Sequence, residues 1–352
     1  MPIFDQGYQH WQGRLTGHAW RWLTISRHGV RTHLRNRWVR LVVLFALFPA
    51  LVLAAFLCIW GLIEQKTNQA LLQMLPFLPD AIKNAPREFR VPIWTLAYDY
   101  FFQVEMFFIM ILVVIVGPGL ISQDLRFNAL PLYFSKPLRR IDYFVGKLGV
   151  IGFYLGAVAV VPAVFAYVLG LGFSLDLGVV RDTGGVLLGS IGYGVVIMLS
   201  AGTLMLAMSA LSRNSLYVGA IWVGIWLISG AAGSILSETV RADWCPLASY
   251  TANLQRIGQA LLGTDIAEKR IRDTMLPPEA AVAVSQIQGP RQSGKGGAAP
   301  PRPHRGRGPG GVEQQQHRPS PRWYWCAGVL LGLFGLSSWI LTTRVKSLDR
   351  LK

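Results

Sequence analysis

Residues Gly117 to Lys147 read GPGLISQDLRFNALPLYFSKPLRRIDYFVGK and lie between two long apolar runs. This loop is too polar to span lipid and too short to fold as a domain of its own. Pro131 and Pro137 divide it into short segments, and a helix can restart after each proline. Its paired cationic and aromatic side chains indicate a membrane protein that contacts a soluble partner at this point.

The composition of the 352 residues is typical of a membrane protein. Hydrophobic residues make up 52% and charged residues 15%, with a mean hydropathy of +0.38, whereas an ordinary soluble domain is about 25% charged. Apolar runs of about 20 residues can cross a bilayer as helices. We therefore predict an all-α polytopic membrane protein with six transmembrane helices. The six runs are Leu41–Ile63, Tyr100–Ile121, Leu148–Phe173, Gly184–Ser212, Leu216–Leu236 and Trp325–Thr343.

The distribution of Lys and Arg indicates which side each loop faces. With six spans both termini share a side, which holds 17 Lys and Arg against four Asp and Glu. The other side also holds 17 Lys and Arg, against 13 acids, and the tie is broken only when the low-complexity residues 289–322 are set aside, which leaves 10 against 12. Because positive charge accumulates in cytoplasmic loops, we predict cytoplasmic N- and C-termini and a cytoplasmic loop 122–147. The net charge of +16 is then mainly a topology signal, and no nucleic-acid partner is expected.

The N-terminal segment 1–40 has apolar side chains at helical intervals. Trp11, Leu15 and Trp22 follow a three- and four-residue spacing, with arginines off that stripe. This pattern predicts an amphipathic helix that lies in the membrane surface. A disordered basic tail attracted to anionic lipid is the alternative, because several glycines weaken helix propensity.

The rest of the chain divides by composition. Residues 41–236 hold spans one to five with the loop 122–147, and residues 237–288 form an outer helical region. Residues 289–322 are rich in Gly, Pro and Arg and are expected to be disordered. Residues 323–352 hold the sixth span and a basic cytoplasmic tail.

Within the loop, Leu138 to Lys147 has the pattern of a short amphipathic coupling helix. Leu138, Ile141 and Phe144 share one helical face, while the charged side chains lie elsewhere. Such a helix can lie on the membrane and present its polar face to a partner.

Glu105 stands out because it lies inside the second apolar run. An acid at membrane depth is a candidate for a functional site, so we treat it as a possible intramembrane polar site for substrate or proton handling. By the run boundaries it is about five residues, roughly 7 Å, from the outer end of its helix, where interfacial water is within reach.

No motif for catalysis or for nucleotide binding is convincing. Residues 289–296 read GPRQSGKG, which matches G-x-x-x-x-G-K but has Gly296 where a magnesium-binding Ser or Thr is needed. No triad, paired carboxylates or metal-ligand spacing is present at membrane depth, so we expect neither an enzyme nor a metal site. Of the three cysteines, Cys58 is expected to pack in the first span, and whether Cys245 and Cys326 pair stays open.

At the loop the chain resembles the permease subunits of ABC-2 type transport systems. The resemblance rests on GPGLISQD at the end of span two and on the run LPLYFSKPLRRIDYFVGK entering span three. The short basic ending RVKSLDRLK is also similar to the family's tail. The matching residues in the second run are Ser135, Lys136, Pro137, Leu138, Arg140, Asp142, Tyr143, Gly146 and Lys147.

The resemblance implies a multi-pass protein of the bacterial inner membrane that forms the path of an ATP-driven exporter. A separate ATP-binding subunit would dock on the loop and carry ATP and Mg²⁺, so the chain itself would bind no cofactor. Its further partners would be a second permease subunit, in a homo- or heterodimer, and membrane lipid. The expected contacts with the ATP-binding subunit are Asp124, Arg126, Lys136, Pro137, Arg139, Arg140, Asp142, Tyr143 and Lys147.

Two other functions are compatible with these features. One is a membrane anchor that uses the same ATPase to move or tether surface machinery without passing a solute. The other is a membrane-embedded enzyme that acts on lipid-linked substrates. Fold alone does not decide among them, nor does it identify a substrate.

Overall fold

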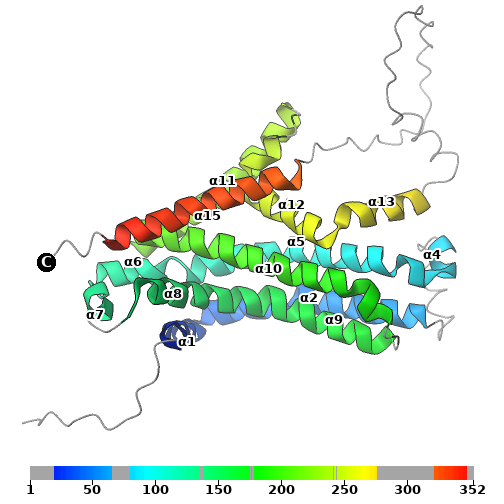
Figure 1. The fold of residues 1–352 in the computed structure, drawn as a ribbon, viewed down its shortest axis with the longest axis horizontal. Coiled ribbons are helices and arrows are strands. Elements are labelled where there is room, and N and C mark those ends of the chain that lie inside the picture. Colours follow the sequence, from blue (N-terminus) through cyan, green and yellow to red (C-terminus); the bar gives the residue numbers. More distant parts are fainter. Residues whose placement is uncertain are drawn as a thin grey trace, which may run out of the picture.

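The computed structural model describes residues 20–65, 80–134, 138–174, 176, 178–240, 242, 244–275 and 321–346. Every secondary-structure element in these ranges is a helix (Figure 1). Six helical stretches are long and apolar enough to cross a membrane: Arg37–Glu64, Pro86–Arg126, Arg140–Ser174, Gly178–Leu211, Ser215–Thr239 and Trp323–Arg344. The predicted all-α fold with six spans is confirmed.

Several of these stretches consist of more than one element. The elements in chain order are α1 (Arg21–Leu34), α2 (Arg37–Glu64), α4 (Asp80–Asn84), η2 (Pro86–Phe89), α5 (Arg90–Val116), α6 (Gly119–Arg126), α7 (Leu130–Phe134), α8 (Arg140–Leu155), the π-helical turn η3 (Gly156–Val160), α9 (Val161–Ser174), α10 (Gly178–Leu211), α11 (Ser215–Thr239), η4 (Cys245–Ala248), α12 (Tyr250–Leu262), α13 (Thr264–Met275) and α15 (Trp323–Lys346).

Short polar side chains start several helices by local capping. The side chain of Asn36 accepts from the Trp38 amide at 3.0 Å, and that of Asn214 accepts from the Leu216 amide at 3.0 Å. Ser249 does the same for α12, which ends at Gly263 with a left-handed φ of 76°. Each cap satisfies an amide that has no partner within its own helix.

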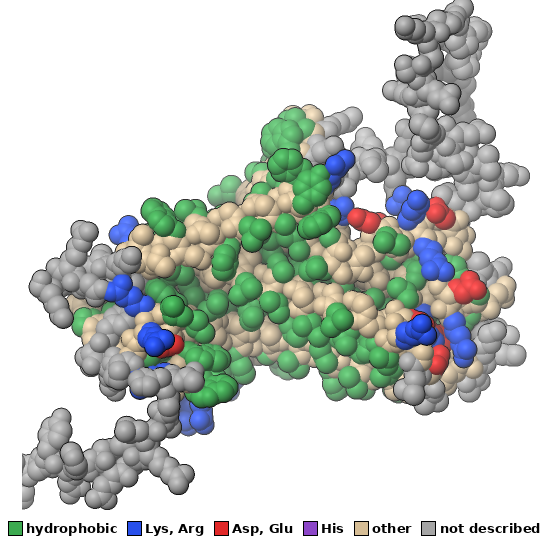
Figure 2. All heavy atoms as spheres, in the orientation of Figure 1, with side chains coloured by type: hydrophobic (Ala, Val, Ile, Leu, Met, Phe, Trp, Pro, Cys, Tyr) green, Lys and Arg blue, Asp and Glu red, His purple; other side chains and the backbone are tan. Residues whose placement is uncertain are grey.

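The long helices lie side by side with their charged groups at the two ends of the bundle. We call the end that holds α1, α6 and α7 the α7 end, and the opposite end the α4 end (Figure 1). Figure 2 shows Lys, Arg, Asp and Glu gathered at these ends, with hydrophobic side chains over the surface between them. This band fits the hydrocarbon region of a bilayer.

Helices α5 and α10 form the centre of the bundle, and their spans are the most buried. Helix α2 packs on α5 and α9, while α12 and α15 pack on α10. Helix α11 is largely exposed and diverges from the bundle toward its C-terminal end (Figure 1). The exposed side chains of α2, α11 and α15 are mostly apolar, as expected for faces that meet lipid.

The structure corrects the predicted ends of two spans. Span two begins at Pro86 rather than at Tyr100, and span three begins at Arg140 rather than at Leu148. The early turns were missed because they carry charged side chains that lower the apolar signal, although Arg90 and Lys147 among them form ion pairs in the fold. The segment Leu138 to Lys147 is therefore not a separate coupling helix, since from Arg140 onward it forms the first turns of span three.

The N-terminal helix α1 is packed against the bundle. The Ser26 hydroxyl donates to the Gly146 carbonyl at 2.8 Å, and the Tyr154 hydroxyl donates to the Val30 carbonyl at 2.9 Å. These bonds attach α1 to α8, the helix that enters span three. The predicted amphipathic helix thus exists over Arg21–Leu34, whereas residues 1–19 lie outside the described part.

We expect Gly146→Leu to separate α1 from α8. A Cβ at this position would lie 2.8 Å from Ile25 Cβ and 3.0 Å from the Trp22 carbonyl oxygen, so either helix must move. Overpacking of this kind costs about 1–3 kcal/mol, and the melting temperature in detergent should fall accordingly. The control is Gly172→Leu, at an exposed glycine with open space around it. Equal melting of the two variants would contradict this packing.

Candidate functional site

The loop between spans two and three is built on a break in the helix. Helix α5 ends at Val116, and α6 starts at Gly119 after Pro118. Gly117 packs directly on the Met205 side chain of α10, where a Cβ would not fit. A proline has no amide hydrogen to continue the helical ladder, so the chain leaves span two as a short separate helix close to α10.

Ser209 of α10 completes the start of α6. Its hydroxyl oxygen accepts from the amides of Ile121 and Ser122, at 3.1 and 2.9 Å, and donates to the Pro118 carbonyl at 2.7 Å. The first amides of a helix lack partners within it, and here a residue almost 90 positions away supplies one. Sequence reasoning missed Ser209, because nothing in the local pattern of the fourth span marks it.

Asp124 of α6 holds α8 through two strong hydrogen bonds. Its Oδ2 accepts from the Tyr143 hydroxyl and from the Lys147 ammonium group, each at 2.7 Å. Lys147 also lies 5.8 Å from the ring centroid of Tyr133 on α7 and 5.4 Å from that of Tyr143. We call Asp124, Tyr133, Tyr143 and Lys147 the Asp124 cluster, and it joins α6, α7 and α8.

The Asp124 cluster is shielded from solvent. The side chains of Asp124 and Lys147 are 15% and 11% exposed, and Tyr143 is fully buried. Burial and the Asp124 carboxylate raise the pKa of Tyr133, which keeps that hydroxyl neutral. Burial and the nearby charge of Lys147 lower the pKa of His33 on α1. Hydrogen bonds to ionised groups are among the strong ones, so the cluster fixes the loop.

A second group of loop side chains lies at the surface. Arg126 and Arg139 are exposed, Arg140 is partly exposed, and two apolar side chains, Phe127 and Ile141, are exposed beside them. We call these five residues the loop face. Asp142 is partly exposed and accepts from the Arg139 amide at 3.3 Å, which caps the start of α8.

The nine predicted contact residues therefore fall into three sets. Asp124, Tyr143 and Lys147 form a shielded brace, and Arg126, Arg139, Arg140 and Asp142 lie toward the surface. Lys136 and Pro137 lie outside the described residues. The structure differs from the prediction at Lys147, which is buried rather than on a polar face open to a partner, while Ile141 is 71% exposed.

Glu105 lies deep in the bundle. It is 15 residues, or about 22 Å, from the start of α5 at Arg90, rather than five residues from a helix end. Its side chain is fully buried, and neither carboxyl oxygen has a hydrogen-bond partner among the described residues. An unpartnered carboxyl is costly in lipid, which keeps Glu105 a candidate for an intramembrane polar site.

An ion cluster at the α4 end was not foreseen. Arg90 of α5 pairs with Glu64 of α2 at 2.9 Å, with Asp182 of α10 at 3.0 Å and with Asp176 at 3.3 Å. The Trp60 indole also donates to Glu64 at 2.6 Å. The Gly178 amide and then the Arg90 guanidinium lower the pKa of Asp176. The cluster ties spans one, two and four together.

The described residues contain no cluster of metal-ligating side chains and no disulfide bond. No group of three His, Cys, Asp or Glu side chains within them could hold a metal ion. Cys58, Cys245 and Cys326 are free thiols, the last two buried. Residues 289–296, which carry the incomplete nucleotide motif, lie outside the described ranges.

A family model described as ABC-2 family transporter protein matches residues 23–262. The matched region runs from α1 through the first five spans and the loop to the end of α12. No curated protein matches the chain at a significant level.

We expect Asp124→Asn to destabilise the chain by about 3 kcal/mol, because it leaves the buried Lys147 ammonium without a counter-charge. Thermal unfolding in detergent measures the effect. Asp142→Asn is the matched control, since Asp142 caps α8 from a more exposed position and should cost about 1 kcal/mol or less. The double variant Asp124→Leu/Lys147→Met should recover part of the loss, because no charge is left unpaired. Equal melting of the two Asn variants would show that the ion pair contributes little.

Proposed function

Because the family model matches more than half of the chain, the chain belongs to the ABC-2 transporter family, and we propose that it is the permease of an exporter and couples to a separate ATP-binding subunit. Family membership makes it a multi-pass membrane component of a transporter. The exporter direction and the ATP-driven coupling are our proposal. The Asp124–Lys147 pair is the observation that supports the coupling, whereas the direction rests on the family resemblance.

The proposal assigns a mechanical role to the loop. The ATP-binding subunit docks on the loop face, where Arg126 and Arg139 offer positive charge beside the exposed Phe127 and Ile141. A force on α6 reaches span three through Lys147 and span four through Ser209. Because rigid elements transmit small displacements into larger rearrangements, the braced loop suits the coupling of ATP hydrolysis to motion of the spans.

The proposed orientation places the α7 end in the cytoplasm of a bacterial cell, with the bundle in the inner membrane. The excess of Lys and Arg over acids on this side supports it. ATP and Mg²⁺ then belong to the partner subunit, and the chain itself is no enzyme. A second permease subunit, in a homo- or heterodimer, and the surrounding lipid complete the proposed assembly, which includes no nucleic acid.

Glu105 is the proposed polar site along the path. It lies on the interior face of α5, one helical turn from Phe102, whose ring packs on that of Tyr193 in α10 at 4.8 Å. A carboxyl without a partner in such a core is retained where it serves a substrate or a proton.

The test of the proposal is copurification followed by charge reversal. An ATP-binding protein should copurify with the chain in mild detergent at matching stoichiometry. The basic loop face implies an acidic surface on the partner. We therefore expect Arg126→Glu/Arg139→Glu to weaken its binding about tenfold, or about 1.4 kcal/mol, because two negative surfaces would then face each other. Membrane insertion should be unchanged.

The matched control is Arg213→Glu, an exposed arginine in the connection between α10 and α11, on the same proposed side of the membrane. It should bind the ATP-binding subunit like the unmodified chain. Unchanged affinity of the double variant would remove the loop face as the docking surface, and transport without any copurifying ATPase would refute the coupling itself.

A further inference from the structure

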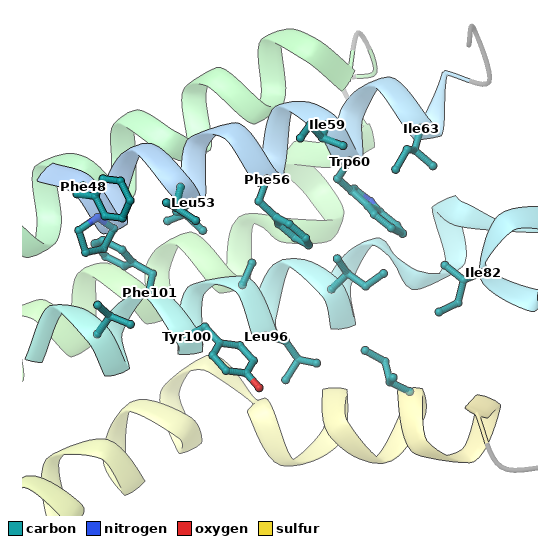
Figure 3. Close-up of a pocket in the computed structure, with 16 residues that line it drawn as sticks. Phe48, Leu53, Phe56, Ile59, Trp60, Ile63, Ile82, Leu96, Tyr100 and Phe101 are labelled. Atoms are coloured by element: carbon teal, nitrogen blue, oxygen red, sulfur yellow. The ribbon is translucent and has the colours of Figure 1, made fainter. Parts of the chain in front are cut away.

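A long groove of about 770 Å³ lies between α2 and α5. Figure 3 shows Phe56 and Trp60 of α2 pointing toward α5, Phe101 of α5 close to Phe48, and Leu96 and Tyr100 of α5 on the side toward α13. Ile82 of α4 and Ile271 of α13 line its end toward the α4 end of the bundle. Its volume is within the roughly 300–1,000 Å³ of small-molecule sites in proteins.

The lining of the groove is almost entirely hydrocarbon. Among its lining residues, side-chain nitrogen or oxygen atoms occur at Trp60 and Tyr100, and the Trp60 nitrogen is already bonded to Glu64. Leu53, Trp60 and Phe101 form a buried floor, whereas Phe48 and Tyr100 are each 67% exposed at the rim. The groove is therefore open to the surrounding membrane and offers an apolar bed.

The groove is also elongated along the membrane normal. Its α2 wall runs from Phe48 to Ile63, a rise of about 22 Å at 1.5 Å per residue. This length covers more than half of a hydrocarbon core about 30 Å thick. A narrow apolar channel of this length fits an extended hydrocarbon chain better than a compact ligand.

A separate polar pocket of about 370 Å³ lies at the α4 end of the bundle, where α2 ends and α5 begins. It is lined by Glu64, Gln65 and residues 84–88. The two sites adjoin in the chain, since Glu64 follows Ile63 and Asn84 is two residues beyond Ile82. Glu64 is neutralised by Arg90, and the consecutive residues Arg87 and Glu88 add one exposed cation and one exposed anion to the lining. The pocket thus offers partners to a head that carries both charges.

We propose that the groove and the pocket together bind one amphipathic lipid, with a hydrocarbon chain in the groove and a zwitterionic head at Arg87 and Glu88. Burial of the lipid's hydrocarbon chain in the groove is favourable wherever the floor of the groove packs against it more closely than bulk lipid does. The head gains charge-assisted hydrogen bonds at the membrane surface. This site is independent of the proposed ATP-driven coupling, because it faces the membrane and lies at the opposite end from the loop face.

The test uses the full chain, purified without an ATP-binding subunit and placed in phosphatidylcholine nanodiscs. These contain a small fraction of phosphatidylethanolamine with a photoactivatable diazirine at the end of one acyl chain, and adducts are located by mass spectrometry. We expect adducts to concentrate on the groove segments of α2 and α5. A second phosphatidylethanolamine, labelled in its head, should form adducts with residues 84–88.

A variant pair tests occupancy directly. Ala97→Trp places a large side chain in the groove and should lower groove adducts at least fivefold. Ala220→Trp is the matched control on the exposed apolar face of α11 and should leave them unchanged.

Three results would overturn the proposal. The first is an even spread of adducts over the exposed faces of α2, α11 and α15 in the unmodified chain. This result does not depend on the folding of any variant. The second is groove adducts that persist in a folded Ala97→Trp variant. The third is few groove adducts in an unmodified chain that self-associates, with that self-association lost in Ala97→Trp, which would assign the groove to a second copy of the chain.

Discussion

The hydrocarbon core of a bilayer offers no hydrogen-bond partner, and this constraint explains where the bundle places its charges. Apolar contacts between helices gain little when lipid is equally apolar, so polar pairs contribute much of the specificity of packing. Arg90 with Glu64 and Lys147 with Asp124 meet this need at opposite ends of the bundle. The first pair holds α5 beside α2, and the second holds α8 beside α6.

In the Asp124 cluster the ion pair also stiffens the connection between spans two and three. An ordinary topology signal would leave Lys147 in water, but here the ammonium group points inward, against two aromatic rings and one carboxylate. The free energy that holds it there also holds α6 against α8. Since Ser209 holds the other end of α6 to α10, the short helix cannot move without two spans. A loop with only solvated charges would lack this stiffness.

The sequence predicted what depends on local pattern and missed what depends on distant contacts. Six apolar runs predicted six spans, because length and hydropathy are sufficient for that. The start of span two was misplaced since Arg90 and Asp99 interrupt the apolar run, although both are buried in the fold. That error put Glu105 near a helix end. The nine contact residues of the loop stay a prediction. Periodicity could not show which face of α8 is buried, because α1 and α6 cover the side that carries Lys147.

Helix α5 connects Glu105, the apolar groove and the loop that follows span two. Its interior face carries Glu105, its outer face carries Tyr100 and Val104 of the groove, and its end continues through Gly117 and Pro118 into α6. Pro118 removes one amide from the helical ladder, but hydroxyl groups of Ser122 and Ser209 bond its carbonyl, so the junction stays ordered. A displacement of α6 must therefore act on α10 and α5 together. Because Phe102 of α5 packs on Tyr193 of α10, the surroundings of Glu105 would change with it, while the groove on the other side of α5 keeps its own wall in α2.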